Sequence, residues 1–215
     1  TRRRRGLGLQ PVREASECSR DRHARTVNGS HVEPLRDLSE IPLCLDPRDN
    51  HFAALTYAYT ASKCSDAFRA FMGALPLRRR VRIGRRELLL VHGSPRRINE
   101  FLFESTTPAA YLEVLLDQER ADAMLCTHTG LDWHRRLPSG RDGVNVGVLG
   151  RPANDGRTEV RYAIVESAGD GIRVERIRLA YDHERLAREM RAEALPEEFV
   201  ETILTGWWTT CLEVL

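Results

Sequence analysis

The stretch ELLLVHGSPRRINEFLF, residues 87–103, decides the fold and raises the question of function. Its first five residues are apolar enough to form a strand buried on both faces. Together with the preceding VRIGRR, residues 81–86, they predict a hairpin that turns near Gly84. The strand ends in His92, and a Gly-Ser-Pro turn follows directly. The sequence therefore places an imidazole at the end of a buried strand.

Helical and strand patterns alternate outward from this strand. Apolar residues at helical spacing predict helices over 65–75 and 107–118, and their first residues, Ser65 and Thr107, are of types that cap helix N-termini. The run DAMLC, residues 122–126, predicts a second short buried strand. This order favours parallel strands joined by helical crossovers.

The C-terminal part predicts more strands and then helices. Residues 143–158 read as a strand and a glycine-rich loop, and the next strand alternates Val160, Tyr162 and Ile164. In GIRVERIRLA, residues 171–180, the apolar phase shifts between Val174 and Ile177, which predicts a β-bulge. The last predicted elements are helices over 182–194 and 196–206. The whole order indicates an α/β protein with a mixed sheet system.

Composition excludes several classes of protein. The 215 residues are 41% hydrophobic and 30% charged, which suits a soluble protein with a buried core. The net charge of +2 gives no argument for nucleic-acid binding, which stays a minor alternative based on the arginine-rich start of the chain. No apolar run approaches the roughly 20 residues that a membrane helix needs. We therefore expect neither a membrane nor a nucleic acid as partner.

Cysteine usage and local composition bear on location and domains. The five cysteines are widely spread and form no CxxC pair, which argues against a disulfide framework and for the reducing cytoplasm. Residues 1–50 are polar and show no sustained period, so we expect an irregular segment there. Residues 51–215 are expected to form the folded domain. The sequence gives no oligomeric state.

Three strand-end loops carry the candidate chemistry: residues 91–95, 126–130 and 145–147. Ligands of α/β sheets bind beyond the carboxyl ends of the strands, where such loops meet. His92 and His128 each follow an apolar strand directly, and a neutral imidazole held there is a good metal ligand. The alternative is that each is a hydrogen-bonded structural histidine.

Other residues near these loops are candidates for binding a substrate. Arg96 is predicted to clamp a phosphate, because a guanidinium matches phosphate oxygens bidentately; the alternative is a solvated rim. Asn145 and Gly147 are further substrate-binding candidates, although Gly147 also suits an ordinary turn. The pair Trp207-Trp208 fits either a partner-binding patch or a lid over the core.

Taken together, LLLVHGSPRRINEFLFE, LCTHTGLDWHRRLPSGR and VNVGVLGRPANDGRT resemble the calcineurin-like metallophosphoesterases. The small bacterial phosphodiesterase type, related to diadenosine tetraphosphatases, is the most similar. The resemblance implies two facing mixed β-sheets flanked by helices, an α/β/β/α sandwich. It also implies two divalent metal ions (Mn, Fe, Zn or Ni) and a small phosphorylated substrate. On this basis His92 and His128 match metal ligands of the family.

The chain departs from the family pattern at other ligand positions. Gly130 stands where a second histidine of the Gly-His-x-His motif belongs, and the sequence contains neither Asp-x-His nor Gly-Asp-x-x-Asp. The nearest match to the Gly-Asn-His motif is NGSHV, residues 28–32, which would make His31 the acid that protonates the leaving group. We therefore expect an incomplete N-terminal unit.

Two functions follow from the resemblance. One is a metal-dependent phosphoesterase that hydrolyses phosphodiesters, phosphomonoesters or nucleotides, active or inactive in this truncated form. The alternative is a non-catalytic binding or scaffold protein with the same fold.

Overall fold

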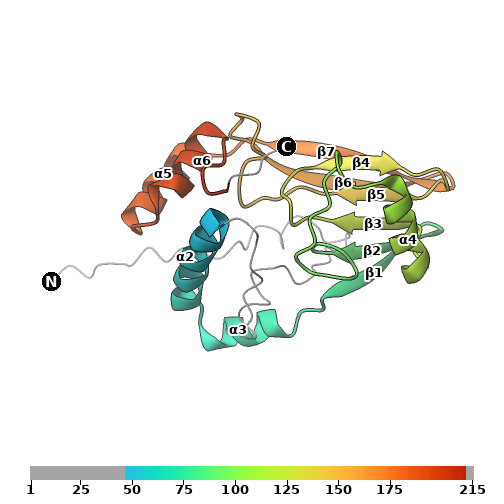
Figure 1. The fold of residues 1–215 in the computed structure, drawn as a ribbon, viewed down its shortest axis with the longest axis horizontal. Helices are drawn as coiled ribbons and strands as arrows, with labels where there is room; N and C mark the ends of the chain where they lie inside the picture. Colours follow the sequence, from blue (N-terminus) through green and yellow to red (C-terminus); the bar gives the residue numbers. More distant parts are fainter. Residues whose placement is uncertain (1–46, 212–215) are drawn as a thin grey trace.

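Two β-sheets face each other in the computed structural model, which describes residues 47–211 (Figure 1). The five-stranded sheet has the order β1-β2-β3-β5-β4 and is formed by β1 (Arg78–Ile83), β2 (Arg86–Val91), β3 (Ala123–Cys126), β5 (Asp142–Asn145) and β4 (Trp133–Arg136). Strands β2, β3 and β5 are parallel to one another, whereas β1 and β4 are antiparallel edge strands. The carboxyl ends of the three parallel strands therefore lie at one edge of the sheet.

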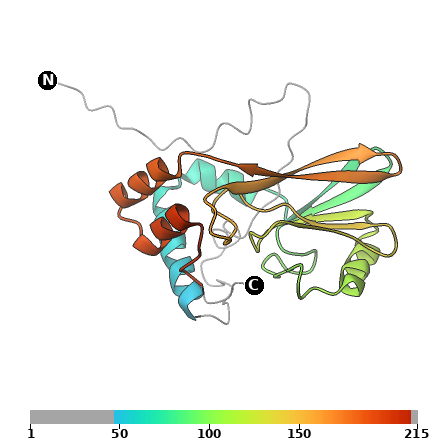
Figure 2. The ribbon, with the colours of Figure 1, turned by 90° about the horizontal axis from the view of Figure 1, so that it is seen from above.

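The second sheet is a long hairpin of β6 (Val160–Ala168) and β7 (Gly171–Leu179). Figure 2 shows this hairpin on one side of the five-stranded sheet and helix α4 (Ala109–Glu119) on the other. The predicted α/β fold with two facing sheets and flanking helices is confirmed.

Strand β2 explains the double layer. Leu89 and Val91 pack with α4 in one apolar cluster, whereas Leu88 and Leu90 pack toward the β6–β7 hairpin in a second cluster. Because successive side chains of a strand point to opposite faces, both faces of β2 must be apolar. This confirms the prediction of a strand buried on both faces.

The turn between β1 and β2 needs glycine. Gly84 has φ +60, and a Cβ there would lie 2.4 Å from Oγ of Ser167 in the facing hairpin. The turn is therefore shaped both by the left-handed backbone and by the close approach of the second sheet.

Four helices gather at the end of the molecule away from α4 (Figure 1): α2 (Pro47–Lys63), α3 (Asp66–Gly73), α5 (His183–Ala192) and α6 (Glu197–Thr205). The predicted N-caps Ser65 and Asp182 accept hydrogen bonds from the backbone N–H groups of Phe68 and Arg185. Gly206 ends α6 in the left-handed conformation. The ring of Phe52 on α2 packs edge-on against Phe199 of α6, with 5.5 Å between centroids. No helix within residues 47–211 is long and apolar enough to cross a membrane.

The predicted bulge in β7 is wrong. The pairing of β6 with β7 is continuous from Val160↔Leu179 to Ala168↔Gly171. Ile172 and Val174 face the five-stranded sheet, while Leu179, on the opposite face of the hairpin, is 45% exposed. The apolar residues move from one face of β7 to the other without an inserted residue, because Ile172 and Val174 lie on one face and Ile177 and Leu179 on the opposite face.

The predicted strand through Val160, Tyr162 and Ile164 is β6, in which Val165 packs into the cluster between the two sheets. One further prediction needs correction. Thr107 does not cap α4; Pro108 occupies the N-cap position, and no side chain caps the helix there. Of the segment 1–50, the part before Pro47 lies outside the described residues.

Candidate functional site

The three candidate loops meet at the end of the five-stranded sheet where the parallel strands have their carboxyl ends. The backbone N–H of Thr127 donates to the carbonyl oxygen of His92 over 2.8 Å, and that of Val146 donates to Cys126 over 2.9 Å. These bonds continue the parallel ladder beyond the ends of the strands. The loops after β2, β3 and β5 are therefore held side by side, as the sequence predicted.

His92 and His128 are in direct contact. Nε2 of His92 lies 3.0 Å from Nδ1 of His128, and the ring centroids are 4.9 Å apart with the planes at 70°. The Phe101 ring lies against His128 on another side, with 4.4 Å between centroids, and is itself 47% exposed. Two imidazoles from adjacent strands thus converge beside an exposed aromatic ring.

The backbone at His128 is strained. Its φ of +54 lies in the left-handed region, which non-glycine residues seldom adopt. The N–H of Thr129 donates to the carbonyl of Thr127 over 2.6 Å, which closes a tight turn around the histidine. Strained backbone of this kind concentrates at functional sites, where surrounding contacts hold it in place.

Asn145 makes the hydrogen bonds that hold the strained turn at His128 in place. This residue is fully buried, and its Nδ2 donates to the carbonyl of Thr127 over 2.7 Å and to Oγ1 of Thr129 over 2.9 Å. Its Oδ1 accepts the N–H of Gly147 over 3.0 Å. The amide therefore ties the β3 loop to the β5 loop and fixes the turn that carries His128.

Gly147 and Gly93 are needed for the shape of the loops. Gly147 has φ +73, and a Cβ there would lie 3.1 Å from the Arg161 carbonyl oxygen. At Gly93 a Cβ would lie 2.5 Å from the carbonyl oxygen of Ile98. Both positions exclude larger residues because the backbone passes so close. The substrate-binding role of Asn145 and Gly147 stays a prediction.

Arg96 is directed toward helix α4. Its guanidinium donates to the hydroxyl of Tyr111 over 2.7 Å and lies 4.0 Å from the carboxylate of Glu100. The side chain is half exposed. The structure thus places Arg96 on the turn after His92, with its charged end on Tyr111, and its role in phosphate binding stays a prediction.

The histidine pair fits part of one metal site. Two imidazole nitrogens bound to one divalent cation at about 2.1 Å, with an angle of about 90–110°, lie about 3.0–3.4 Å apart. The 3.0 Å between Nε2 of His92 and Nδ1 of His128 meets this condition. The same distance also suits a hydrogen bond between one protonated and one unprotonated ring nitrogen.

A complete two-metal site does not fit the described part of the chain. Within residues 47–211 no group of three or more His, Cys, Asp or Glu side chains is placed to hold a metal ion. Burial raises the pKa of the nearby Cys126 thiol to about 12, so this residue is not a thiolate nucleophile at neutral pH. His31 lies outside the described residues.

The position expected to hold a second histidine is closed. Gly130 has φ +76, and a Cβ there would lie 3.3 Å from the ring of Trp208 and 3.6 Å from Nε of Arg151. A histidine at position 130 would be strained and would displace the tryptophan. Arg151 and Trp208 carry no local sequence signal for this site, because their contact with Gly130 depends on packing between distant segments.

Comparison with known proteins supports the fold. No family model matches the sequence, and no curated protein matches it. A metallophosphoesterase from Sphaerobacter thermophilus is similar in structure, with a TM-score of 0.62 and 23% identity over 84% of this chain and 76% of that chain. A hypothetical protein from Pyrococcus horikoshii, PH1004, has a TM-score of 0.66 and 21% identity over 85% of this chain and 73% of the other. At these identities the similarity is one of fold.

Proposed function

We propose that the chain is a metal-dependent phosphoesterase by descent, in which His92 and His128 hold a divalent cation. The observation that carries the proposal is the 3.0 Å approach of the two imidazoles at the carboxyl ends of neighbouring parallel strands. Its fold is shared with a metallophosphoesterase, which supports a phosphoester as substrate. The candidate substrates are a phosphodiester, a phosphomonoester or a nucleotide.

The residues of the chain have separate tasks in this proposal. A bound divalent cation supplies a Lewis acid that polarises the phosphoryl oxygen and acidifies a water molecule. His92 and His128 contribute neutral ring nitrogens to it, and Asn145 holds the turn that aims His128. A second metal, and a leaving-group acid at His31, require residues beyond the described range. The cation is one of Mn, Fe, Zn or Ni.

The alternative is a non-catalytic scaffold of the same fold. It is favoured by the absence of a three-ligand group within residues 47–211 and by the closed position at Gly130. Two imidazoles alone bind a divalent ion weakly, because most of the coordination sphere is then water. The two functions differ in one measurable property, which is the metal-dependent turnover of a phosphoester.

Metal content and hydrolysis of bis(p-nitrophenyl) phosphate test the proposal on the full 215-residue chain. The wild type should bind Mn, Fe, Zn or Ni and hydrolyse the diester, and His92→Ala and His128→Ala should each weaken metal binding more than tenfold. His183→Ala on α5 is the matched control, because it removes an imidazole that packs against Tyr181 and not against the histidine pair, and it should change neither property.

Each result separates the functions. Metal binding without hydrolysis favours the scaffold, and a wild type that binds no metal refutes the metal site. If His92→Ala lowers the melting temperature strongly while the wild type binds no metal, the histidine pair is a structural hydrogen bond.

A further inference from the structure

Arg151 lies flat against Trp208 beside the turn that carries His128. Its Cζ is 3.7 Å from the centroid of the Trp208 ring, within cation–π range. Trp208 is fixed in turn, because its Nε1 donates to the carbonyl of Pro152 over 2.8 Å. Both side chains border Gly130, two residues after His128. A guanidinium is thus held over an aromatic ring beside the loop that carries His128.

This guanidinium lacks a nearby counter-charge in the described part of the chain. No carboxylate of residues 47–211 lies within 4.0 Å of Arg151, whereas the neighbouring Arg161 contacts both Asp132 and Asp155. Burial lowers the pKa of Arg151, and the more distant charges of Cys211 and Asp49 offset only part of that effect. Its side chain still keeps partial exposure. An anion placed against it would gain a strong, charge-assisted contact.

Asn154 accepts a hydrogen bond from the same tryptophan and keeps an unused amide donor. Its side chain is 6% exposed, and its Oδ1 accepts the backbone N–H of Trp208 over 2.6 Å. This bond fixes the amide orientation, so Nδ2 is directed away from that N–H. Nδ2 is buried and donates to no described residue. A buried donor without an acceptor costs about 1–3 kcal/mol, which a ligand oxygen would offset.

We propose that Arg151 and Asn154, arranged on Trp208, form an anion subsite that takes a phosphate group. A guanidinium suits this ligand because its planar fork matches two phosphate oxygens, and an amide N–H adds a third contact. The space that a second histidine would need at position 130 is bordered by the Trp208 ring and by the Arg151 side chain. Its identification as a substrate phosphate rests on the proposed function, but the binding of phosphate does not.

Binding of inorganic phosphate to the full chain tests the subsite. Isothermal titration calorimetry on the wild type, Arg151→Gln and Arg151→Lys measures the affinity, with metal content measured on the same samples. Arg151→Gln should weaken phosphate binding at least tenfold, and Arg151→Lys should weaken it less, because lysine keeps the charge and loses the planar fork. Arg188→Gln on α5 is the control, since it removes the same charge from an exposed side chain.

The outcomes distinguish this subsite from the proposed function. Loss of phosphate affinity in Arg151→Gln with unchanged metal content supports the subsite, even if the wild type hydrolyses no diester. Equal phosphate affinity in the wild type and both Arg151 variants overturns it, as does a wild type that binds no phosphate. If Arg151→Gln fails to fold, the comparison of Arg151→Lys with the wild type decides, and Asn154→Asp, which adds a negative charge, should also weaken phosphate binding.

Discussion

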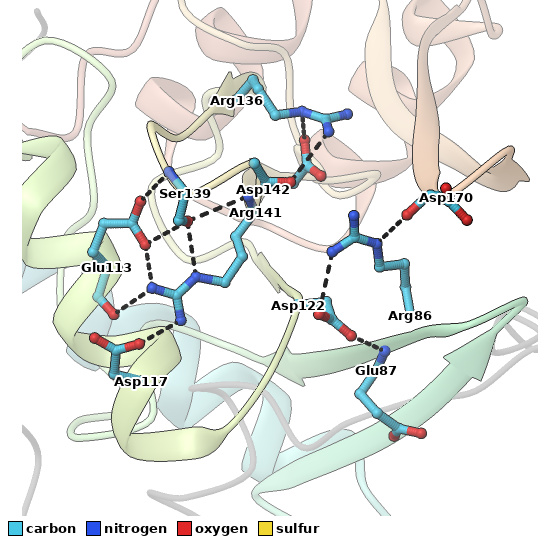
Figure 3. A network of polar contacts seen from close by, with 11 residues as sticks. Arg86, Glu87, Glu113, Asp117, Asp122, Arg136, Ser139, Arg141, Asp142 and Asp170 are labelled. Atoms are coloured by element: carbon cyan, nitrogen blue, oxygen red, sulfur yellow. Dashed lines mark hydrogen bonds and ion pairs between the residues drawn. The ribbon is translucent and has the colours of Figure 1, made fainter.

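The two ends of the five-stranded sheet differ in how their charged side chains are paired. At the amino end of the parallel strands, carboxylates are paired with arginines from neighbouring elements (Figure 3). Asp122 contacts Arg86 at 3.2 Å, and Arg141 contacts both Glu113 and Asp117. The carboxyl end also holds a matched group, Arg161 with Asp132 and Asp155, but beside its two imidazoles lies Arg151, which has no carboxylate within 4.0 Å among residues 47–211.

This difference predicts which substitutions change stability and which change ligand binding. A charge that is matched within the protein contributes to folding and leaves little to offer a ligand. A fixed cation without a matching carboxylate, beside strained backbone at His128, is typical of a binding site. We therefore expect substitutions at the amino end to change stability and those at the carboxyl end to change binding.

The largest expected effect is at Asp142, at the start of β5. Its carboxylate is 3% exposed and contacts Nε of Arg136 at 2.9 Å and Nε2 of His134 at 2.8 Å. Asp142→Ala leaves these donors without their buried acceptor, and the free energy of unfolding should fall by about 2–3 kcal/mol. Urea unfolding measures it, and metal and phosphate binding should stay unchanged.

Asp170→Asn is the control for this substitution. The Asp170 side chain is 91% exposed and lies 3.7 Å from Arg85, so its loss should cost less than about 0.5 kcal/mol. If Asp142→Ala is as mild as Asp170→Asn, the amino end is not the stabilising end of the sheet.

The next largest effect on the free energy of unfolding is expected at Gly130, with Gly140 as the comparison. Gly130 and Gly140 have φ +76 and +79, so alanine at either position costs about 1 kcal/mol in backbone strain. A Cβ at Gly130 also lies 3.3 Å from Trp208, whereas nothing lies within 4 Å at Gly140. Gly130→Ala should therefore cost about 1 kcal/mol more than Gly140→Ala.

The two glycine variants also test whether phosphate binds at the carboxyl end of the sheet. Gly130→Ala shifts Trp208 and with it Arg151, so it should weaken phosphate binding in calorimetry, and Gly140→Ala should not. Equal phosphate affinities in the two variants would show that the tryptophan does not position the guanidinium.

Most of the fold could be predicted because its signals are local. The side chains on both faces of β2 are apolar, and Gly84 indicates the hairpin turn before it. Ser65 and Asp182 are residue types that commonly cap helix N-termini. Helix α2 was missed because Phe52 is its one buried residue, so the helix leaves almost no apolar period in the sequence. The bulge was wrongly predicted because the apolar residues of β7 change from one face of the hairpin to the other, a pattern that the sequence alone does not distinguish from an inserted residue.

The candidate site could be predicted only in part, for the same reason. His92 and His128 were found because each directly follows a buried strand, and adjacent parallel strands then bring them together. Arg151 has no such local sequence signal, because the position of its guanidinium depends on Trp208 from the C-terminal segment. Local sequence predicts which side chains reach the edge of a sheet, while long-range packing decides which of them meet.

The smallest expected effect is a pH dependence at the amino end. Burial by itself would raise the pKa of Glu113, but hydrogen bonds from Ser139 and Arg141 and the charge of Arg141 hold it below its ordinary value of 4.5. A carboxylate with a lowered pKa stabilises the folded state above the unfolded-state pKa, and this contribution is lost as pH falls through the folded-state pKa. This contribution should therefore be lost progressively as the pH falls below 4.5.

Unfolding of the wild type and Glu113→Gln by urea at pH 7 and pH 3 measures this contribution. Glu113→Gln should be less stable than the wild type at pH 7, and the difference should shrink at pH 3, because the wild-type carboxylate is increasingly protonated as the pH falls. Glu201→Gln, an exposed position on α6, should follow the wild type at both pH values. A difference between Glu113→Gln and the wild type that stays equally large at pH 3 would mean that the shape of the Ser139 turn, and not the ionic pair, stabilises this end of the sheet.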